Sequence, residues 1–501
     1  MLKNKKKNRV YFGVITFILI LILIVMFLSL ILNKLNISGQ QTSINNGLLE
    51  SSLVTLNNVF SIDGIKFLLG SCITNLSLFE PLIVLMLSVM CVGILESSGI
   101  LNHVFSRFMR IKTNFIIFIT LLISIVFSCF GEYSYLLLFP LIGTIYKVMG
   151  KNPIIGIITV FLGITLGYGM GTFINSDGYM LGLLTEQAAV LDVDPSYKFN
   201  IFSTIYIMIV GAILILFMLT LFIERNVIPK VKKIEKENVE YKTSKKGLVV
   251  SGIMFIVSLI IIVLIVLPKS PYLDQTGNDY MSKLFGEDSI IKSGILFIIL
   301  MSSVAIGTVY GKVSNNFKNG VDSNMGISYN FNNLGYTFVI MFFGSMLISI
   351  LDYTNIGTII VTGLTNLLSI MDFSGIFLIV TFIIIVIIMT VLVPGMIDKW
   401  VLMSPIIVPL FMRANITPEF CQYLYVTSSS IGRAVTPLFL YILIMVGFVN
   451  KYDSEKEYST VGKMYKLVLP TTLSAAGIMI LFVLLWYVSG LPVGVGGYPS
   501  L

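Results

Sequence analysis

The sequence predicts an all-α polytopic membrane protein with about nine transmembrane helices, two opposed re-entrant hairpins, several broken helices and an inverted repeat. Three observations support this prediction. Apolar residues make up 56% of the 501 residues, charged residues only 12%, and the mean hydropathy is +0.95, whereas soluble domains carry roughly 25% charged residues. The apolar residues stand in continuous runs, which excludes the alternating strands of a membrane β-barrel. Several runs are interrupted by short polar, glycine-containing breaks.

Composition and single residues exclude several other functions. The net charge of +8 does not indicate nucleic-acid binding, because the Lys and Arg residues stand in short loops, where the orientation signals of membrane proteins belong. His103 is the one histidine, and neither a C-x-x-C spacing nor a Walker motif occurs. We therefore expect no enzyme activity, no cofactor and no metal centre, apart from a coupling Na⁺ that exposed carbonyls at the helix breaks could coordinate.

The distribution of charge predicts the orientation of the chain in the membrane. A basic N-terminus precedes an apolar run over about 10–32 and no cleavage site follows, which is typical of an anchor helix with a cytoplasmic N-terminus. With that start, roughly 24 of the 33 Lys and Arg residues fall on the cytoplasmic side, and the C-terminus lies outside.

The order of runs and breaks divides the chain into two halves. Residues 113–148 and 373–413 each form a pair of short apolar runs around a polar break, which we interpret as two hairpins that enter from opposite faces. A broken helix follows each hairpin, so the same order occurs twice, upside down, as in transporters with inverted repeats. The predicted segments are an anchor helix with an external segment (1–80), the first half (81–223), a charged cytoplasmic linker (224–246), scaffold helices (247–333), the second half (334–466, with a broken helix at 418–449), and a last helix with an external C-terminus (467–501).

The helix breaks are the predicted location of the chemistry. Unwinding a helix in the membrane leaves N–H and C=O groups unsatisfied, so a break persists only where protein, ion or substrate satisfies them. Glu132 lies in the first hairpin break and Asp177 in the break of the following helix, and we expect both to carry protons during coupling. Alternatively, Glu132 pairs with a basic residue to fix the fold, and Asp177, like Asn175, serves as a helix cap.

The breaks of the second half supply the predicted substrate site. The fork of the Arg433 guanidinium matches a carboxylate, although Arg433 could instead neutralise Glu132 or Asp398. Hydroxyls in membrane helices most often bond to their own backbone, but a cluster of them beside Arg433 favours a site. Alternatively, the Asp-Lys pair after the second break is a hairpin tip with local charge compensation, and the Trp that follows is an interfacial anchor. The residues assigned to substrate binding are Asp352, Asn355, Asp398, Lys399, Trp400, Ser428, Ser429, Ser430, Arg433, Thr436 and Pro437.

Four stretches resemble those of one known transporter family. Residues 399–412, KWVLMSPIIVPLFM, resemble the K-W-x-x-x-A-P-I-F-V-P-M-x-M signature of the AbgT family, which comprises p-aminobenzoyl-glutamate transporters and exporters of sulfonamide antimetabolites. Residues 93–99 resemble its G-V-A-E-K-S-G, 185–189 its T-T-E-A-A and 353–357 its W-S-N-L-G. The resemblance implies a homodimer of subunits with nine helices and two opposed hairpins, a scaffold around an inner transport core, and coupling to an ion gradient, usually of protons.

The charges at the site depart from the family pattern. The family carries S-D-A-G-Y where residues 131–135 read GEYSY, so by resemblance Glu132 takes the coupling role of the acid. Its G-S-G-S-A is replaced by PGMID at 394–398, which adds a charge. The same solute as in the family therefore does not follow. Three further family residues, an Arg, an Asp and an Asn, correspond to Val426, Ser429 and Arg433, and the Asn before W-S-N corresponds to Asp352.

The sequence thus favours an ion-gradient-coupled secondary transporter of a small carboxylate-bearing solute, either p-aminobenzoyl-glutamate-like or an antimetabolite such as a sulfonamide. Two alternatives stay open: a transporter of a different organic anion on the same fold, and a non-transporting scaffold or receptor that has lost coupling. A channel is disfavoured, because opposed hairpins suit alternating access.

Overall fold

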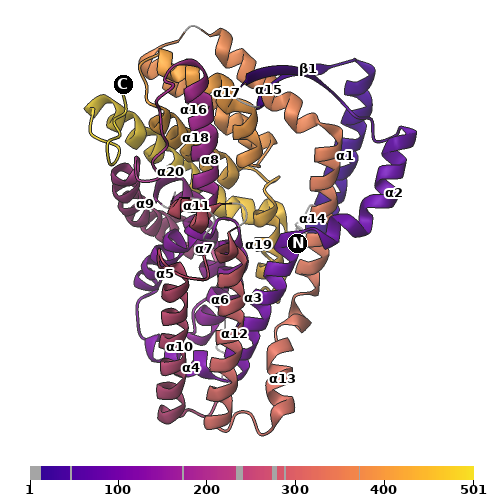
Figure 1. Ribbon diagram of the computed structural model, residues 1–501. Helices are drawn as coiled ribbons and strands as arrows, with labels where there is room; N and C mark the ends of the chain where they lie inside the picture. The colour runs from indigo at the N-terminus through magenta and orange to yellow at the C-terminus, as the bar shows by residue number, and fades with distance from the viewer. Residues whose placement is uncertain are drawn as a thin grey trace, which may run out of the picture.

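The computed structural model describes residues 13–45, 48–171, 174–232, 241–273, 279–286, 289–371 and 373–501. Within these ranges the chain is helical apart from loops and a single two-stranded sheet (Figure 1). In the view of Figure 1, α15–α17 and the strands lie toward the top, α4, α10, α12 and α13 toward the bottom, and α7 between them. The all-helical membrane fold predicted from hydropathy is confirmed.

The N-terminal part contains more regular structure than the sequence predicted. Helix α1 packs lengthwise against α14, while α2 also contacts α14. Strands β1 and β2 pair antiparallel with Ser38 opposite Thr55, and β1 lies against α15 and α17. The predicted external segment therefore holds a strand pair that covers part of the second half. The bounds are α1 (Val14–Lys34), β1 (Ser38–Asn45), β2 (Leu48–Thr55) and α2 (Ile62–Ser77).

The first half places a nearly wholly buried helix, α7, at the centre of the molecule. All its residues from Pro153 to Met170 are buried, because α5, α6, α9 and α18 surround it. Its glycines permit this close approach: a Cβ at Gly163 or Gly167 would come within 2.7 Å of α5 atoms. The bounds are α3 (Glu80–Ser97), α4 (Ile100–Phe105), η1 (Ser106–Phe108), α5 (Thr113–Phe127), η2 (Ser128–Phe130), α6 (Tyr133–Val148), α7 (Pro153–Gly171), α8 (Ser176–Asp192), α9 (Ile205–Asn226) and η3 (Ile228–Lys230).

The middle segment packs beside α3. Helices α10 and α12 lie against each other, and α12 and α13 contact α3. Of the predicted charged linker over 224–246, residues 233–240 lie outside the described part. The bounds are α10 (Lys245–Val266), α11 (Tyr280–Phe285), α12 (Ile290–Val313), α13 (Gly320–Ser328) and η4 (Phe331–Asn333).

The second half repeats the packing of the first. The first arm of each predicted hairpin packs on the helix that begins its own broken element, α5 on α7 and α16 on α18. The second arm of each also contacts the far piece of the other broken element, α6 touching α19 and α17 touching α8. These reciprocal contacts agree with an inverted repeat. The bounds are α14 (Gly335–Thr354), α15 (Ile356–Ile370), α16 (Gly375–Leu392), α17 (Ile397–Arg413), α18 (Pro418–Val435), α19 (Leu440–Tyr452) and α20 (Val461–Ser489).

The number of spans is compatible with nine crossings. By length and composition, 10 helical stretches in the described part could cross a membrane, and the pair α18–α19, bent by 42°, forms one more. Two of the 10, Thr113–Phe130 and Gly375–Leu392, are the first arms of the predicted hairpins. Setting these two aside and counting α18–α19 as one span leaves about nine, as the sequence predicted.

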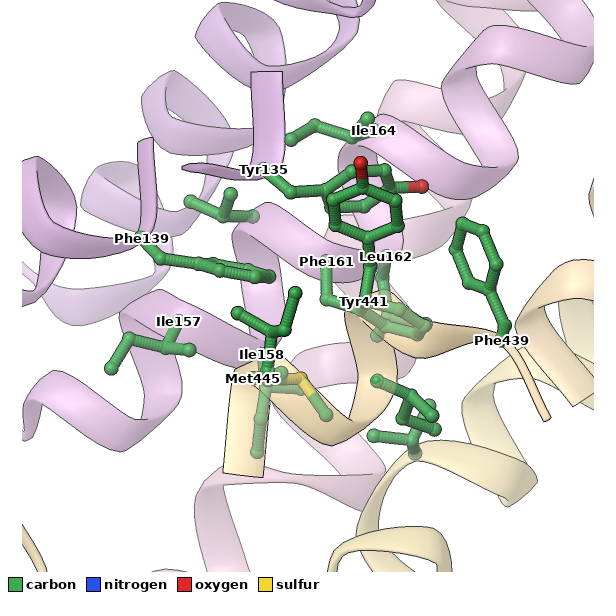
Figure 2. Close-up of a cluster of buried hydrophobic side chains, with 14 of the residues drawn as sticks. Tyr135, Phe139, Ile157, Ile158, Phe161, Leu162, Ile164, Phe439, Tyr441 and Met445 are labelled. Carbon is green, nitrogen blue, oxygen red and sulfur yellow. The ribbon is translucent and has the colours of Figure 1, made fainter. Parts of the chain in front are cut away.

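A cluster of aromatic side chains connects α6 and α7 of the first half with α19 of the second half. Tyr135 of α6 stacks on Tyr441 of α19 at 4.7 Å between ring centroids and meets Phe439 edge-on at 5.8 Å. Figure 2 shows these rings above Phe161 of α7, with Met445 of α19 filling the space below. Such pairs contribute about 0.5–1.5 kcal/mol each beyond apolar burial. They hold α19 in a fixed position relative to hairpin 1.

Candidate functional site

The break of hairpin 1 is a tight turn that presents an acidic side chain. η2 ends at Phe130 and is followed by Gly131, whose φ of +58° lies in the left-handed region that favours glycine. Glu132 follows as the residue before α6. A Cβ added at Gly131 would lie 2.9 Å from Oδ2 of Asp177, so this turn and the start of α8 approach closely. The break thus brings two carboxylates to one place.

Arg433 connects the breaks of both hairpins. Its Nη2 donates to Oε1 of Glu132 at 2.9 Å, and its Nε donates to the carbonyl of Pro394 in hairpin 2 at 2.9 Å. The guanidinium carbon also lies 5.1 Å from the ring centroid of Phe439. The Arg433 side chain is 11% exposed and that of Glu132 39% exposed. Of the alternatives considered for Arg433, the structure shows the pairing with Glu132.

A cavity with two lobes opens around this ion pair. The first lobe, of about 320 Å³, lies between α14–α15, hairpin 2 and the start of α19, and Asp352, Asp398 and Lys399 line it. The second lobe, of about 570 Å³, lies between hairpin 1, α8 and α11–α12, and Asp177 and Arg433 line it. The two lobes share lining residues at Pro81, Glu132, Gly395, Asp398 and Tyr441. The total volume suits a small organic solute.

A much smaller chamber lies behind the ion pair. It has about 10 Å³, and Glu132, Asp177, Arg433, Tyr168 and Ser430 are among the residues that line it. The hydroxyl of Ser430 is buried and has no hydrogen-bond partner in the described part of the chain. A chamber of this size holds about one water molecule.

Two charged or aromatic residues of hairpin 2 are buried in the protein. Lys399 is 1% exposed and donates to the hydroxyl of Thr390. Trp400 is fully buried, donates from Nε1 to Thr185 Oγ1 at 3.0 Å, and stacks on Tyr425 at 4.4 Å. Lys399 borders the first lobe, whereas Trp400 lines neither lobe. Trp400 therefore anchors hairpin 2 against α8 and α18.

The hydroxyl cluster of α18 lies behind the cavity. Ser428 bonds back to the carbonyl of Leu424 at 2.7 Å, as hydroxyls in membrane helices commonly do. Ser429 and Ser430 are buried, and neither lines the two lobes. Thr436 accepts from the N–H of Leu438 and donates to the carbonyl of Val391 at 2.6 Å. Together with Pro437, it sets the bend between α18 and α19.

Asp352 and Asp398 of the second half line the cavity, whereas the neighbouring amide of Asn355 does not. Asp352 and Asp398 are exposed to the first lobe from opposite sides, α14 and hairpin 2. Asn355 has a φ of +58° between α14 and α15 and donates to the carbonyl of Thr55 at 3.1 Å. Its side chain thus fastens the helix break to β2. In the first half, Asn175 caps α8 by accepting from Gly178 N at 2.7 Å.

Sequence reasoning missed three contributors to the site. Glu80 at the start of α3 lines the second lobe and accepts a hydrogen bond from Tyr133. Its position directly before Pro81 and an apolar run could have marked it as an acid at a helix N-terminus. Phe439 and Tyr441 line the cavity from the start of α19, but nothing distinguishes them from other apolar positions in the sequence. In the described part of the chain, no three His, Cys, Asp or Glu side chains form a metal-binding group.

Comparisons with known proteins agree with this architecture. The sequence profile described as "AbgT putative transporter family" matches residues 5–501. The p-aminobenzoyl-glutamate transport protein of Escherichia coli K12 is 24% identical over 497 residues, covering 96% of this chain and 93% of the relative.

Two solved structures are similar. The MtrF protein of Neisseria gonorrhoeae, described as illuminating a class of antimetabolite efflux pumps, has a TM-score of 0.50 and 21% identity over 96% of each chain. The YdaH transporter of Alcanivorax borkumensis has a TM-score of 0.49 and 22% identity over 96% of this chain and 100% of its own. The profile match over almost the whole length shows that this chain belongs to the AbgT transporter family and is a transporter, not an enzyme.

Proposed function

We propose that this AbgT-family member is a proton-gradient-coupled secondary transporter of a small carboxylate-bearing solute. The observation that carries the proposal is the Arg433–Glu132 ion pair, which lies where the two lobes of the cavity meet. The names of the relatives support the solute class, since one is a p-aminobenzoyl-glutamate transport protein and another represents antimetabolite efflux pumps. A p-aminobenzoyl-glutamate-like compound or an antimetabolite such as a sulfonamide is therefore the solute to test first.

The coupling rests on competition for one guanidinium. Ionised Glu132 occupies Nη2 of Arg433, and the carbonyl of Pro394 occupies Nε. A solute carboxylate that takes the position of Glu132 at Nη2 competes with it for that N–H group and for the single positive charge of the guanidinium. Protonation of Glu132 removes its charge and releases that N–H group, so a proton and a solute carboxylate bind together. By linkage, each raises the affinity for the other by the same factor.

Asp177 is the proposed second proton carrier. It lies against the turn at Gly131, and it lines both the second lobe and the small chamber with Glu132. A water in that chamber would contact the orphaned Ser430 hydroxyl and bridge the two carboxylates. Protons can then pass between Asp177 and Glu132 through the small chamber.

The assembly and orientation are proposed with the function. We place the protein in a bacterial cytoplasmic membrane with a cytoplasmic N-terminus and an external C-terminus, because the basic loops cluster on one side. Helix α10 packs against α12, but few of its apolar residues are buried within one subunit, which suits contact with lipid or with a second subunit. A homodimer is the proposed state.

Flux measurements in proteoliposomes test the proposal. Labelled p-aminobenzoyl-glutamate and a labelled sulfonamide are followed under an imposed pH gradient and, separately, under an imposed Na⁺ gradient. We expect accumulation driven by the pH gradient in the wild type and none in Glu132→Gln. Accumulation driven by Na⁺ alone would contradict proton coupling. Absence of flux in sealed vesicles with folded protein would contradict the proposed solutes.

A further inference from the structure

The first lobe of the cavity carries more negative than positive charge at its surface. Asp352 and Asp398 both line it, from α14 and from hairpin 2, and neither forms an ion pair within the described residues. Glu132, which borders the same lobe, is already matched by Arg433. The remaining cation at this wall, Lys399, is 1% exposed and donates to Thr390. We call this lobe, between Asp352 and Asp398, the acidic lobe.

The walls of the acidic lobe also suit a cation. Phe79, Phe439 and Tyr441 line it, and aromatic faces attract ammonium groups. The Tyr441 hydroxyl belongs to a residue that is 3% exposed, and it interacts with Glu132 at the border of the lobe. Figure 2 shows this hydroxyl at the upper edge of the aromatic cluster, above Phe161 and Leu162. The phenol oxygen adds a hydrogen-bond acceptor to this wall.

An ammonium group suits the acidic lobe better than a second carboxylate does. A second carboxylate in the acidic lobe would lie beside two aspartates in a partly desolvated cavity, where like charges repel strongly. An ammonium group would instead receive charge-assisted hydrogen bonds from both carboxylates. The shared lining at Asp398 and Tyr441 places such a group next to the position proposed for the solute carboxylate.

We propose that the acidic lobe binds an ammonium group of the transported solute between Asp352 and Asp398, so that the solute is a zwitterion. The inference rests on the proposed function for the carboxylate end of the solute, which Arg433 binds. The aliphatic ammonium distinguishes this solute from p-aminobenzoyl compounds, because an aromatic amine is neutral at pH 7.

Three matched probes test the inference on the purified full-length protein in detergent. They are 4-(aminomethyl)benzoate, a zwitterion; 4-methylbenzoate, which lacks the ammonium; and benzylamine, which lacks the carboxylate. Binding is measured by isothermal titration at pH 7. We expect the zwitterion to bind about tenfold or more tightly than 4-methylbenzoate, the factor that corresponds to one charge-assisted hydrogen bond. Equal affinities, or no binding of either amine, would overturn the inference.

Substitutions of the two aspartates test whether the preference for amines arises in the acidic lobe. Asp352→Asn and Asp398→Asn should each lower the affinity for both amines about tenfold and leave that for 4-methylbenzoate unchanged or higher. Asp63→Asn is the matched control, since Asp63 lies in α2, pairs with Lys66 at 3.9 Å and lines neither lobe. If the aspartate variants change the dependence of binding on Na⁺ but not the preference for amines, the lobe binds an inorganic cation and the inference is wrong.

The same data separate the inference from the proposed function. Arg433→Gln should weaken the two carboxylate probes and spare benzylamine. If the affinity for benzylamine depends on Asp352 and Asp398 while the affinity for the carboxylate probes does not depend on Arg433, the proposed function is wrong and the ammonium site in the acidic lobe is supported. If 4-methylbenzoate depends on Arg433 while the amine adds nothing, the proposed function stands and the inference fails.

Discussion

The substitution Glu132→Gln should make solute binding at Arg433 independent of protonation at position 132. Glutamine is neutral at every pH, so it imitates the protonated glutamate and competes less strongly with the solute for Nη2 of Arg433. The affinity for a carboxylate-bearing solute should therefore rise, and its dependence on pH should disappear. Net accumulation driven by a pH gradient should be lost, while exchange of internal for external solute continues.

The magnitude follows from the geometry of the pair. A hydrogen bond to a charged group contributes about 1.5–3 kcal/mol when buried. Arg433 Nη2 and Glu132 Oε1 are 2.9 Å apart, but the Glu132 side chain is 39% exposed, and solvent weakens an exposed pair. We therefore expect about 1–2 kcal/mol, which corresponds to a gain of roughly 5- to 30-fold in affinity at high pH.

Two assays check this prediction. Solute binding is titrated from pH 5 to pH 8 (a range of about three units around neutrality) in wild type and variant, and counterflow is measured in proteoliposomes. Glu50→Gln, at an exposed position of β2, is the matched control and should behave as wild type. Solute affinity that still varies with pH in Glu132→Gln, or accumulation against a gradient by that variant, would refute the competition for Arg433.

Three further predictions concern the supports of the site. Gly131→Ala should abolish transport, because alanine at a φ of +58° costs about 1–2 kcal/mol and its Cβ would meet Asp177 Oδ2 at 2.9 Å; wild-type flux would show that the turn adapts. Trp400→Phe should lower the free energy of unfolding by about 1–3 kcal/mol through the lost bond to Thr185, with unchanged solute affinity; weaker binding at unaltered thermal stability would instead place Trp400 against the solute. His103, in the short helix α4 outside the candidate spans, accepts from Arg107 at 2.9 Å, and burial followed by the charge of Arg107 lowers its pKa below the usual value. Because the folded state binds a proton at His103 more weakly than the unfolded state does, the free energy of unfolding should decrease as the pH drops below about 6.5. The decrease should be smaller in His103→Gln. Equal slopes of unfolding midpoint against pH in the two proteins would contradict this.

The breaks were the part of the fold that the sequence predicted best. Gly131, Pro394 and Pro437 stand inside apolar runs, and backbone chemistry forces the helix to stop or bend at such residues. The strand pair Ser38–Asn45 and Leu48–Thr55 was not predicted, because its first strand is almost uniformly polar and lacks the apolar–polar alternation that marks a strand. Hydropathy had labelled that segment only as external.

The site depends on contacts between residues far apart in the chain, and no local sequence pattern indicates such contacts. Glu132 and Arg433 are 301 positions apart, so the sequence offered a substrate role and an ion pair for Arg433 without a way to choose. Lys399 and Trp400 follow one another in a polar break, and only the packing of hairpin 2 against α8 and α18 shows that both are buried. No sequence pattern marks Tyr441, because its contribution depends on its position on the cavity wall, across from hairpin 2.

Proton uptake on solute binding tests the central claim most directly. A saturating carboxylate-bearing solute is added to the purified protein in weakly buffered detergent solution, and the pH change is recorded in wild type and in Glu132→Gln. If Glu132 and the solute compete for Arg433, the wild type takes up about one proton per bound solute when Glu132 is initially ionised, and the variant takes up none. Equal proton uptake in both proteins would show that the solute binds without displacing Glu132 and would contradict the proposed coupling.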